Sequence, residues 1–242
     1  MIRVTVWNEY RGQESADIRA VHPEGIHRTI EAFLARDPGI IVRTAILDDP
    51  DCGLTDDVLD QTDVLVWWGH CHHGEVPDSV AVRIADAVHK GMGFIPLHSS
   101  HLAKPFTRLM GTSCTLKWRD GDRERLWTLM PTHPIAQGVP ETIELDEEEM
   151  YGERFDIPAP DDLVFLGWFS GGELFRSGCV WNRGLGKVFY FQPGHETNRS
   201  YLNEHIQRII TNAVHFTAPV IRAETLGCPH IAVSYEERNK TE

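Results

Sequence analysis

The stretch Gly91-Met92-Gly93-Phe94-Ile95-Pro96-Leu97-His98-Ser99-Ser100-His101 joins a short apolar run to a cluster of polar side chains. The run 94–97 is too short for a helix and lies between glycines and polar residues, as is typical of a strand covered on both faces. Pro96 would remove a hydrogen-bond donor from a central strand, so it fits only where the strand is ending. We therefore predict a buried strand that delivers His98 to a turn, where open α/β sheets bind ligands.

The segments around this stretch alternate between strand and helix patterns. Strand-like runs occur at 2–7, 40–47 and 63–68, and amphipathic helices are predicted after His22 and at 77–89. This order predicts an α/β fold with a parallel sheet. After a helix within 102–110, the pattern changes to strands at 125–129, 142–145, 163–169, 178–181 and 187–191, which predict a mixed or antiparallel extension. A last helix is predicted from about Tyr201 to Phe216.

The chain of 242 residues has no internal repeat, low-complexity linker or sharp change of composition. A chain of this length can bury roughly 70–75% of the surface that its unfolded form exposes. We predict one domain over residues 1–220, followed by a polar tail over residues 221–242. The tail either packs against a second subunit of a homo-oligomer or is a frayed end.

Charge and cysteine usage narrow the classes of partner. The formal net charge is -13 and no long basic run is present, which argues against nucleic-acid binding. No apolar stretch approaches the ~18 residues of a membrane span, so no membrane association is expected. The five cysteines are odd in number and widely spaced, which argues against a disulfide framework and favours a reducing, cytoplasmic location.

Histidines and aromatic residues gather where strands are predicted to end. In the tract 70–73, His70 directly follows a strand and is retained as a site candidate, whereas His72 and His73 are expected in a solvated loop. Trp7, Trp68 and Tyr151 lie beside polar clusters, and flat aromatic faces next to hydrogen-bonding groups suit a sugar. The alternative for the tryptophans is ordinary core packing. The acidic run 146–149 is most simply a solvated turn, in which only Glu149 is a site candidate.

Several motifs, in this order, resemble the trehalose utilisation (ThuA-like) family, which is similar in fold to class I glutamine amidotransferases. The resemblance covers the chain to about residue 216. Its carriers are His22-Pro23-Glu24-Gly25-Ile26-His27, Trp67-Trp68-Gly69-His70, Gly93-Phe94-Ile95-Pro96-Leu97-His98, His133-Pro134-Ile135, Glu149-Met150-Tyr151, Gly186-Lys187-Val188-Phe189-Tyr190 and Gly194-His195-Glu196. The resemblance implies a three-layer α/β/α fold with a doubly wound, flavodoxin-like, mostly parallel sheet and antiparallel additions.

The resemblance also implies that His98, Glu149 and His195 lie together at the mouth of the sheet, with Glu196 beside them as a further catalytic candidate. Two imidazoles and a carboxylate are a common set of ligands for a divalent metal such as zinc. The alternative is a hydrogen-bonded pocket without metal, in which Glu149 holds one histidine tautomer. The candidate sugar-binding residues are Trp7, His22, His27, Trp68, His70, Ser99, His101 and Tyr151.

Two other types of catalysis are less well supported by the sequence. Amidotransferases carry a nucleophilic cysteine at the elbow after this strand, and here His98 stands at or next to that position, so glutamine hydrolysis through a thiolate is not expected. A serine hydrolase would combine Ser99 or Ser100 with His195 and Glu196, but the G-x-S-x-G elbow is absent. The serines could instead cap the next helix.

The function predicted from the resemblance is cytoplasmic carbohydrate catabolism. The chain is expected to be a metal-assisted enzyme that isomerises or cleaves a disaccharide, or its 3-keto derivative, by proton abstraction. The alternative is a non-catalytic sugar-binding or regulatory protein on the amidotransferase-like scaffold.

Overall fold

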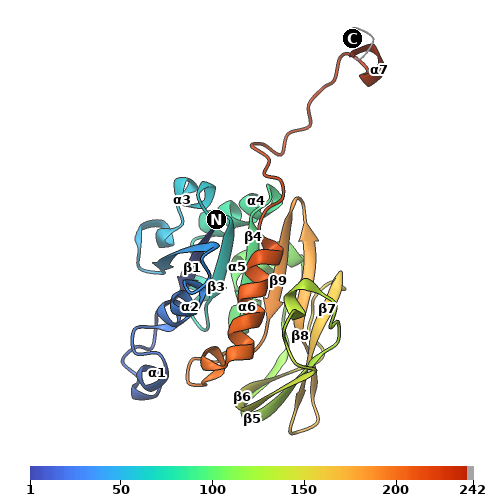
Figure 1. Ribbon diagram of the computed structural model, residues 1–242. Coiled ribbons are helices and arrows are strands. Elements are labelled where there is room, and N and C mark those ends of the chain that lie inside the picture. Colours follow the sequence, from blue (N-terminus) through green and yellow to red (C-terminus); the bar gives the residue numbers. More distant parts are fainter. Residues whose placement is uncertain (239–242) are drawn as a thin grey trace.

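The computed structural model describes residues 1–238, which are built around one sheet of nine strands (Figure 1). Its order is β2-β1-β3-β4-β9-β8-β7-β5-β6. The parallel part consists of β1 (Ile2–Asn8), β2 (Ile40–Ile46), β3 (Val64–Trp68), β4 (Gly93–Leu97) and β9 (Gly186–Phe191). The antiparallel part consists of β5 (Lys117–Thr128), β6 (Thr142–Gly152), β7 (Asp162–Phe169) and β8 (Leu174–Arg183). The predicted mixed sheet is therefore confirmed.

Helices cover both faces of the parallel part, because its strands are apolar on both sides. Along β3, Leu65 and Trp67 pack into one core, whereas Val64, Val66 and Trp68 pack into the other. The first core is covered by α3 (Asp56–Asp60), α4 (Asp78–His89) and α5 (Lys104–Met110). The second is covered by α2 (Ile26–Leu34) and α6 (Glu204–Thr217). The three-layer α/β/α arrangement is confirmed.

Helix boundaries follow local capping. Thr55 accepts a hydrogen bond from the backbone N–H of Val58 and is the N-cap of α3. The last long helix, α6, begins at Glu204 rather than near Tyr201, because the side chain of Asn203 accepts hydrogen bonds from the first free N–H groups. A short helix, α1 (Ala16–Val21), was not predicted; its single buried residue, Ile18, gives too little apolar pattern.

The strand β4 lies at the centre of the sheet and ends as its proline requires. Pro96 is the penultimate residue of β4, and His98 follows with a φ of +51°. This left-handed conformation is uncommon for a residue with a Cβ and turns the chain sharply. At the start of the strand, a Cβ on Gly93 would lie 2.5 Å from the carbonyl oxygen of Thr217, so glycine lets the end of α6 pack against the sheet.

The acidic run 146–149 is not a solvated turn, and this prediction was wrong. It belongs to β6, which continues to Gly152 instead of ending near residue 145. Asp146 and Glu147 are exposed, but Glu148 and Glu149 are buried. The reason is that Glu148 accepts hydrogen bonds from the loop at 194–200, and Glu149 lies 2.9 Å from Nε2 of His98. A run of charged residues predicts an exposed segment, although charged side chains with hydrogen-bonding partners can be buried.

The C-terminal segment leaves the body of the molecule after α6 (Figure 1). Its first residues contact α4 and the loop after it, where the N–H of Ala223 donates to the carbonyl oxygen of Lys90. The residues beyond are exposed and include the short helix α7 (Tyr235–Arg238). Over residues 1–238, none of the helices has the length and apolar character needed to cross a membrane.

Candidate functional site

The carboxyl ends of the parallel strands open onto a pocket of about 600 Å³. His70 follows β3, the segment 98–102 follows β4, and His195 follows β9, so the three strand ends meet at one edge of the sheet. The strand β6 adds Glu149 and Tyr151 from the side. The pocket is lined by His70, Cys71, His73, Ser99, His101, Leu102, Thr115, Leu116, Trp118, Asp120, Glu149, Tyr151 and His195. Its position agrees with the general location of ligand sites in open α/β sheets.

Three metal-type ligands converge on this pocket. One ligand atom each from His70, Glu149 and His195 lies within 4.8 Å of the other two. Among residues 1–238, this is the one such group of histidine, cysteine or acidic side chains. Glu149 and His195 belong to the predicted ligand set, and His70 takes the third place that the sequence assigned to His98.

His98 lies directly behind this group and is fully buried. Its Nδ1 lies 2.9 Å from the carbonyl oxygen of Gln192, which can only accept, so Nδ1 carries a proton. Its Nε2 lies 2.9 Å from a carboxylate oxygen of Glu149. Burial alone would lower the pKa of His98, but the hydrogen bond and charge of Glu149 outweigh it and raise that pKa. The pair is therefore an imidazolium with a carboxylate, and both ring nitrogens of His98 are occupied.

The other members of the group are also held from behind. His70 Nδ1 donates to Glu196 across 2.7 Å, and His195 Nδ1 lies 2.9 Å from the hydroxyl of Thr197. Burial opposes ionisation of Glu196, but the hydrogen bond from His70 lowers its pKa to about 2. Burial lowers the pKa of His195, which is neutral at pH 7. A carboxylate that accepts from the second ring nitrogen, as Glu196 does from His70, is a frequent outer partner of metal-binding histidines. The Nδ1 of His195 instead accepts a hydrogen bond from the backbone N–H of Thr197.

Two buried carboxylates that the sequence did not single out hold the loops of the site. Glu148 accepts hydrogen bonds from the backbone N–H groups of Glu149, Gly194 and His195, and from the side chains of Asn198 and Ser200. Glu9 accepts from the N–H groups of residues 70, 71 and 72. Glu9 directly follows β1, so the strand-end rule that selected His70 would also have found it. No local pattern in the sequence marked Glu148 as a site residue.

His101 forms another wall of the pocket as a neutral imidazole. Burial lowers its pKa to about 4, and its Nδ1 donates to the carbonyl oxygen of Cys114 across 2.7 Å. The remaining nitrogen, Nε2, is thereby an acceptor available to a ligand. Tyr151 lies between His101 and His98, with its ring stacked on that of His98 at 5.1 Å.

The sequence profile described as "Trehalose utilisation" matches residues 3–217. The chain belongs to the trehalose utilisation family. No curated protein matches it at a significant level.

Solved structures of similar fold agree with this family. A protein described as ThuA-like from Parabacteroides merdae is 15% identical, with a TM-score of 0.67 and coverage of 93% of this chain and 92% of that one. A cytoplasmic protein from Salmonella typhimurium LT2 is 14% identical, with a TM-score of 0.61 and coverage of 90% and 100%. The glutaminase domain of the CTP synthase of Trypanosoma brucei is 9% identical, with a TM-score of 0.52 and coverage of 93% and 98%. At these identities the likeness concerns the fold alone.

Within this member of the family, the elbow after β4 carries no cysteine. The pocket does contain Cys71, which follows β3. Burial, followed by the charge of Glu9, raises the pKa of Cys71, so its thiol is protonated at neutral pH. A protonated thiol is a poor nucleophile. Ser99 and Ser100 do not cap the next helix; their hydroxyls donate to the backbone carbonyls of Gly69 and Trp67.

Other predicted residues lie outside the pocket. Trp7 stacks on Trp67 with ring centroids 3.6 Å apart, and its N–H donates to the carbonyl of Cys52, so it belongs to the core. Trp68 donates to the carbonyl of Gly194 and supports the 194–196 loop. His22 is buried beside Tyr201, and His27 contacts Asn8.

The two histidines that follow Cys71 lie in different environments. His72 bonds Glu75 at the surface, as predicted for a solvated loop. His73 instead lines the pocket, and its Nε2 is buried.

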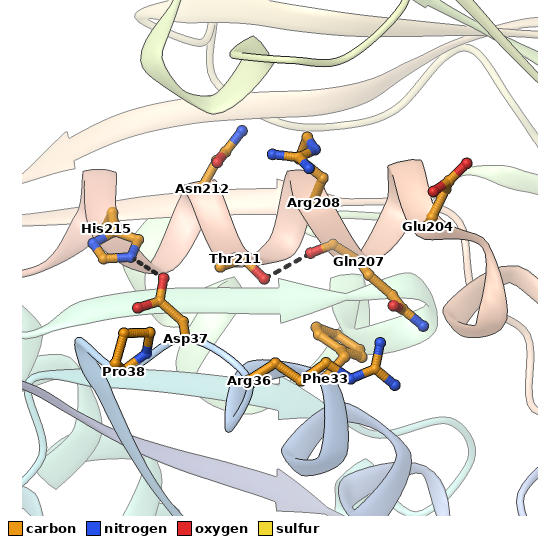
Figure 2. Close-up of a pocket in the computed structure, with 10 residues that line it drawn as sticks. All are labelled: Phe33, Arg36, Asp37, Pro38, Glu204, Gln207, Arg208, Thr211, Asn212 and His215. Carbon is orange, nitrogen blue, oxygen red and sulfur yellow. Dashed lines mark hydrogen bonds and ion pairs between the residues drawn. The ribbon is translucent and has the colours of Figure 1, made fainter.

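A second groove lies between α2 and α6 on the flank of the sheet (Figure 2). Its side chains come from one turn and two helix surfaces, and they include a pair in which His215 donates to Asp37 across 2.8 Å. The groove has a similar volume of about 600 Å³. It lies away from the strand ends and lacks the metal-type group, so the pocket at the strand ends is the stronger candidate site.

Proposed function

We propose that this chain is a cytoplasmic enzyme of carbohydrate catabolism. It acts on a disaccharide such as trehalose, or on the 3-keto derivative, in the pocket at the strand ends. His70, Glu149 and His195 would hold a divalent metal such as zinc. The observation that supports the proposal most is the convergence of these three donors, of which His70 follows β3, Glu149 lies on β6 and His195 follows β9. His70 and Glu149 are each held from behind by a partner, Glu196 and His98 respectively.

The donor set fits zinc or a similar divalent ion. Two imidazoles and one carboxylate leave a coordination position open, as in catalytic zinc sites. His70 fits better than His98 because Glu196 occupies only its Nδ1, which leaves Nε2 for the metal. Both nitrogens of His98 are engaged, so His98 serves as the outer partner of Glu149. A bound divalent metal would polarise a sugar carbonyl and acidify the C–H group beside it.

The chain's own residues supply proton acceptors and orientation. His101 is neutral at pH 7 and is not part of the metal set, so its Nε2 can take a proton from the carbon next to a carbonyl and return it elsewhere. The Nε2 of His101 can also accept a hydrogen bond from a sugar hydroxyl. The hydrogen bonds of Glu196 and Glu9 hold His70 and its loop in place. This arrangement supports isomerisation or cleavage by proton abstraction.

Zinc titration of the metal-free protein tests the metal set. We expect His70→Ala to weaken zinc binding about 100-fold or more, because loss of a direct ligand exceeds the 10–100-fold effect of losing an outer partner. His72→Ala is the matched control, since His72 lies two residues away and its side chain bonds Glu75 at the surface, while the substitution keeps its backbone N–H bond to Glu9. Calorimetry measures both. Equal zinc affinity in His70→Ala and the parent protein would contradict the proposed site.

An assay on the 3-keto derivative of trehalose then tests the enzyme itself. Turnover that disappears on chelation and returns with added zinc supports the metal-assisted reaction. Full turnover in the metal-free protein would show that the reaction does not need the metal. Sugar binding without turnover under any divalent metal would favour the non-catalytic alternative. A serine hydrolase is less well supported, because the hydroxyls of Ser99 and Ser100 are bonded to backbone carbonyls.

A further inference from the structure

Trp118 is the most exposed of the seven tryptophans, and it lies at the proposed sugar pocket. Its relative exposure is 64%, although it lines the pocket. An exposed indole forgoes the burial that a large aromatic side chain normally gains. Leu102, which is 41% exposed, and Leu116 stand at the same pocket. The pocket therefore has an apolar rim, in contrast to the histidines and carboxylate at its floor.

The strand register shows on which side Trp118 lies. In the antiparallel ladder between β5 and β6, Trp118 is directly opposite Tyr151. Residues directly opposite one another place their side chains on the same face of the sheet. Tyr151 faces the floor of the pocket, where its ring stacks on His98. Trp118 thus continues the wall that Tyr151 begins, from the floor toward the open mouth.

We propose that Trp118 is the platform for a second sugar ring and selects disaccharides over monosaccharides. This inference rests on the proposed function. One ring would lie at the floor, near His70, Glu149 and His195. The other would pack its C–H face against the indole, as aromatic faces do with apolar surfaces. Asp120, which also lines the pocket, supplies a carboxylate acceptor for the hydroxyls of that outer ring.

The architecture of the strand supports this assignment. β5 begins at Lys117, and its residues 117–121 are all exposed, so no other part of the described chain covers Trp118. The position is held nevertheless: Arg119, the next residue, is bonded to Asp122 and Glu173. Trp118 is therefore presented on an anchored strand rather than on a free loop, which lowers the entropic cost of binding a ligand against it.

Calorimetric titration with trehalose, which has two rings, and with glucose, which has one, tests the proposal. Trp118→Ala is expected to weaken trehalose binding about tenfold, the effect of a typical aromatic contact, and to leave glucose binding unchanged. Trp118→Phe should restore most of the lost affinity. Trp168→Ala is the control, because Trp168 lies on the same antiparallel part of the sheet but packs beneath Arg123 and Arg125 outside the pocket.

The outcomes separate this inference from the function on which it rests. Trehalose binding that is equal in the parent protein and in Trp118→Ala overturns the platform and leaves the proposed function standing. An equal loss for trehalose and glucose also overturns it, since the ring selectivity is then absent. If the parent protein binds none of trehalose, its 3-keto derivative and glucose, the proposed function fails and the platform falls with it. A dimer that dissociates in Trp118→Ala would make Trp118 an interface residue and overturn the inference.

Discussion

Replacing Glu148 by Gln is expected to lower the free energy of unfolding by about 1–3 kcal/mol for each buried donor that loses its acceptor. One oxygen of Glu148 accepts from the N–H groups of Glu149 and His195 and from Asn198. The other accepts from the N–H of Gly194 and from the hydroxyl of Ser200. An amide NH₂ group in either place would face at least one backbone donor, and that donor could no longer be satisfied.

Urea unfolding of Glu148→Gln and Glu147→Gln measures this effect with a matched control. Glu147 is the preceding residue on β6 but is exposed, so its substitution should change stability by less than about 0.5 kcal/mol. Because Glu148 holds the N–H of His195, the variant should also bind zinc more weakly wherever it remains folded. Equal stability of the two variants would show that the bonds around Glu148 contribute nothing net.

Glu148 also shows what the sequence could not predict about the site. The parallel strands, their apolar composition and the histidines that follow them were all readable from local patterns. A buried carboxylate in the run Asp146-Glu147-Glu148-Glu149 has no local signature, because its donors come from residues 194–200, far along the chain. The length of β6 could not be predicted for the same reason, because its buried end depends on contacts with residues far along the chain.

The local sequence pattern likewise could not predict which of His70 and His98 lines the pocket. Both follow buried parallel strands, so the strand-end rule predicts that both reach the same edge of the sheet. Their roles separate only through the backbone of the elbow, where His98 has a φ of +51° and its ring lies against Gln192. That contact occupies Nδ1 and turns Nε2 toward Glu149. The sequence thus predicts histidines and a carboxylate at this edge of the sheet, and the structure shows that His70, and not His98, lines the pocket.

The protein is expected to lose stability steeply as the pH falls from 6.5 to 5. Burial lowers the pKa values of His22, His27 and His101 from about 6.5 to about 4. Between these values the unfolded chain binds protons that the folded chain does not, so acid favours unfolding. Each histidine should remove about 2 kcal/mol of stability by pH 5. Together they would consume much of the 5–15 kcal/mol that holds a typical domain folded.

One group opposes this loss in the same window: burial raises the pKa of Glu124 well above the ordinary glutamate value, so Glu124 binds a proton in the folded chain and adds stability as the pH falls. Burial also lowers the pKa values of His73, His133 and His195, and these groups add to the loss. The stabilisation from His98, whose pKa is raised, is fully present below about pH 6.5 and is lost only at higher pH. Glu196, with a pKa of about 2, contributes a loss only below the ordinary glutamate range near 4.3. Histidine protonation should therefore dominate between pH 6.5 and 5.

Urea unfolding at pH 7, 6 and 5 measures the effect, with His22→Gln as the diagnostic variant. This substitution removes one titrating group, so the fall in stability by pH 5 should be smaller by about 2 kcal/mol. His230→Gln, in the exposed tail, should keep the full pH dependence of the parent protein. If the stability of the parent protein does not change over this range, these histidines bind protons equally well in the folded and the unfolded chain. Their side chains would then be accessible to solvent in the folded protein.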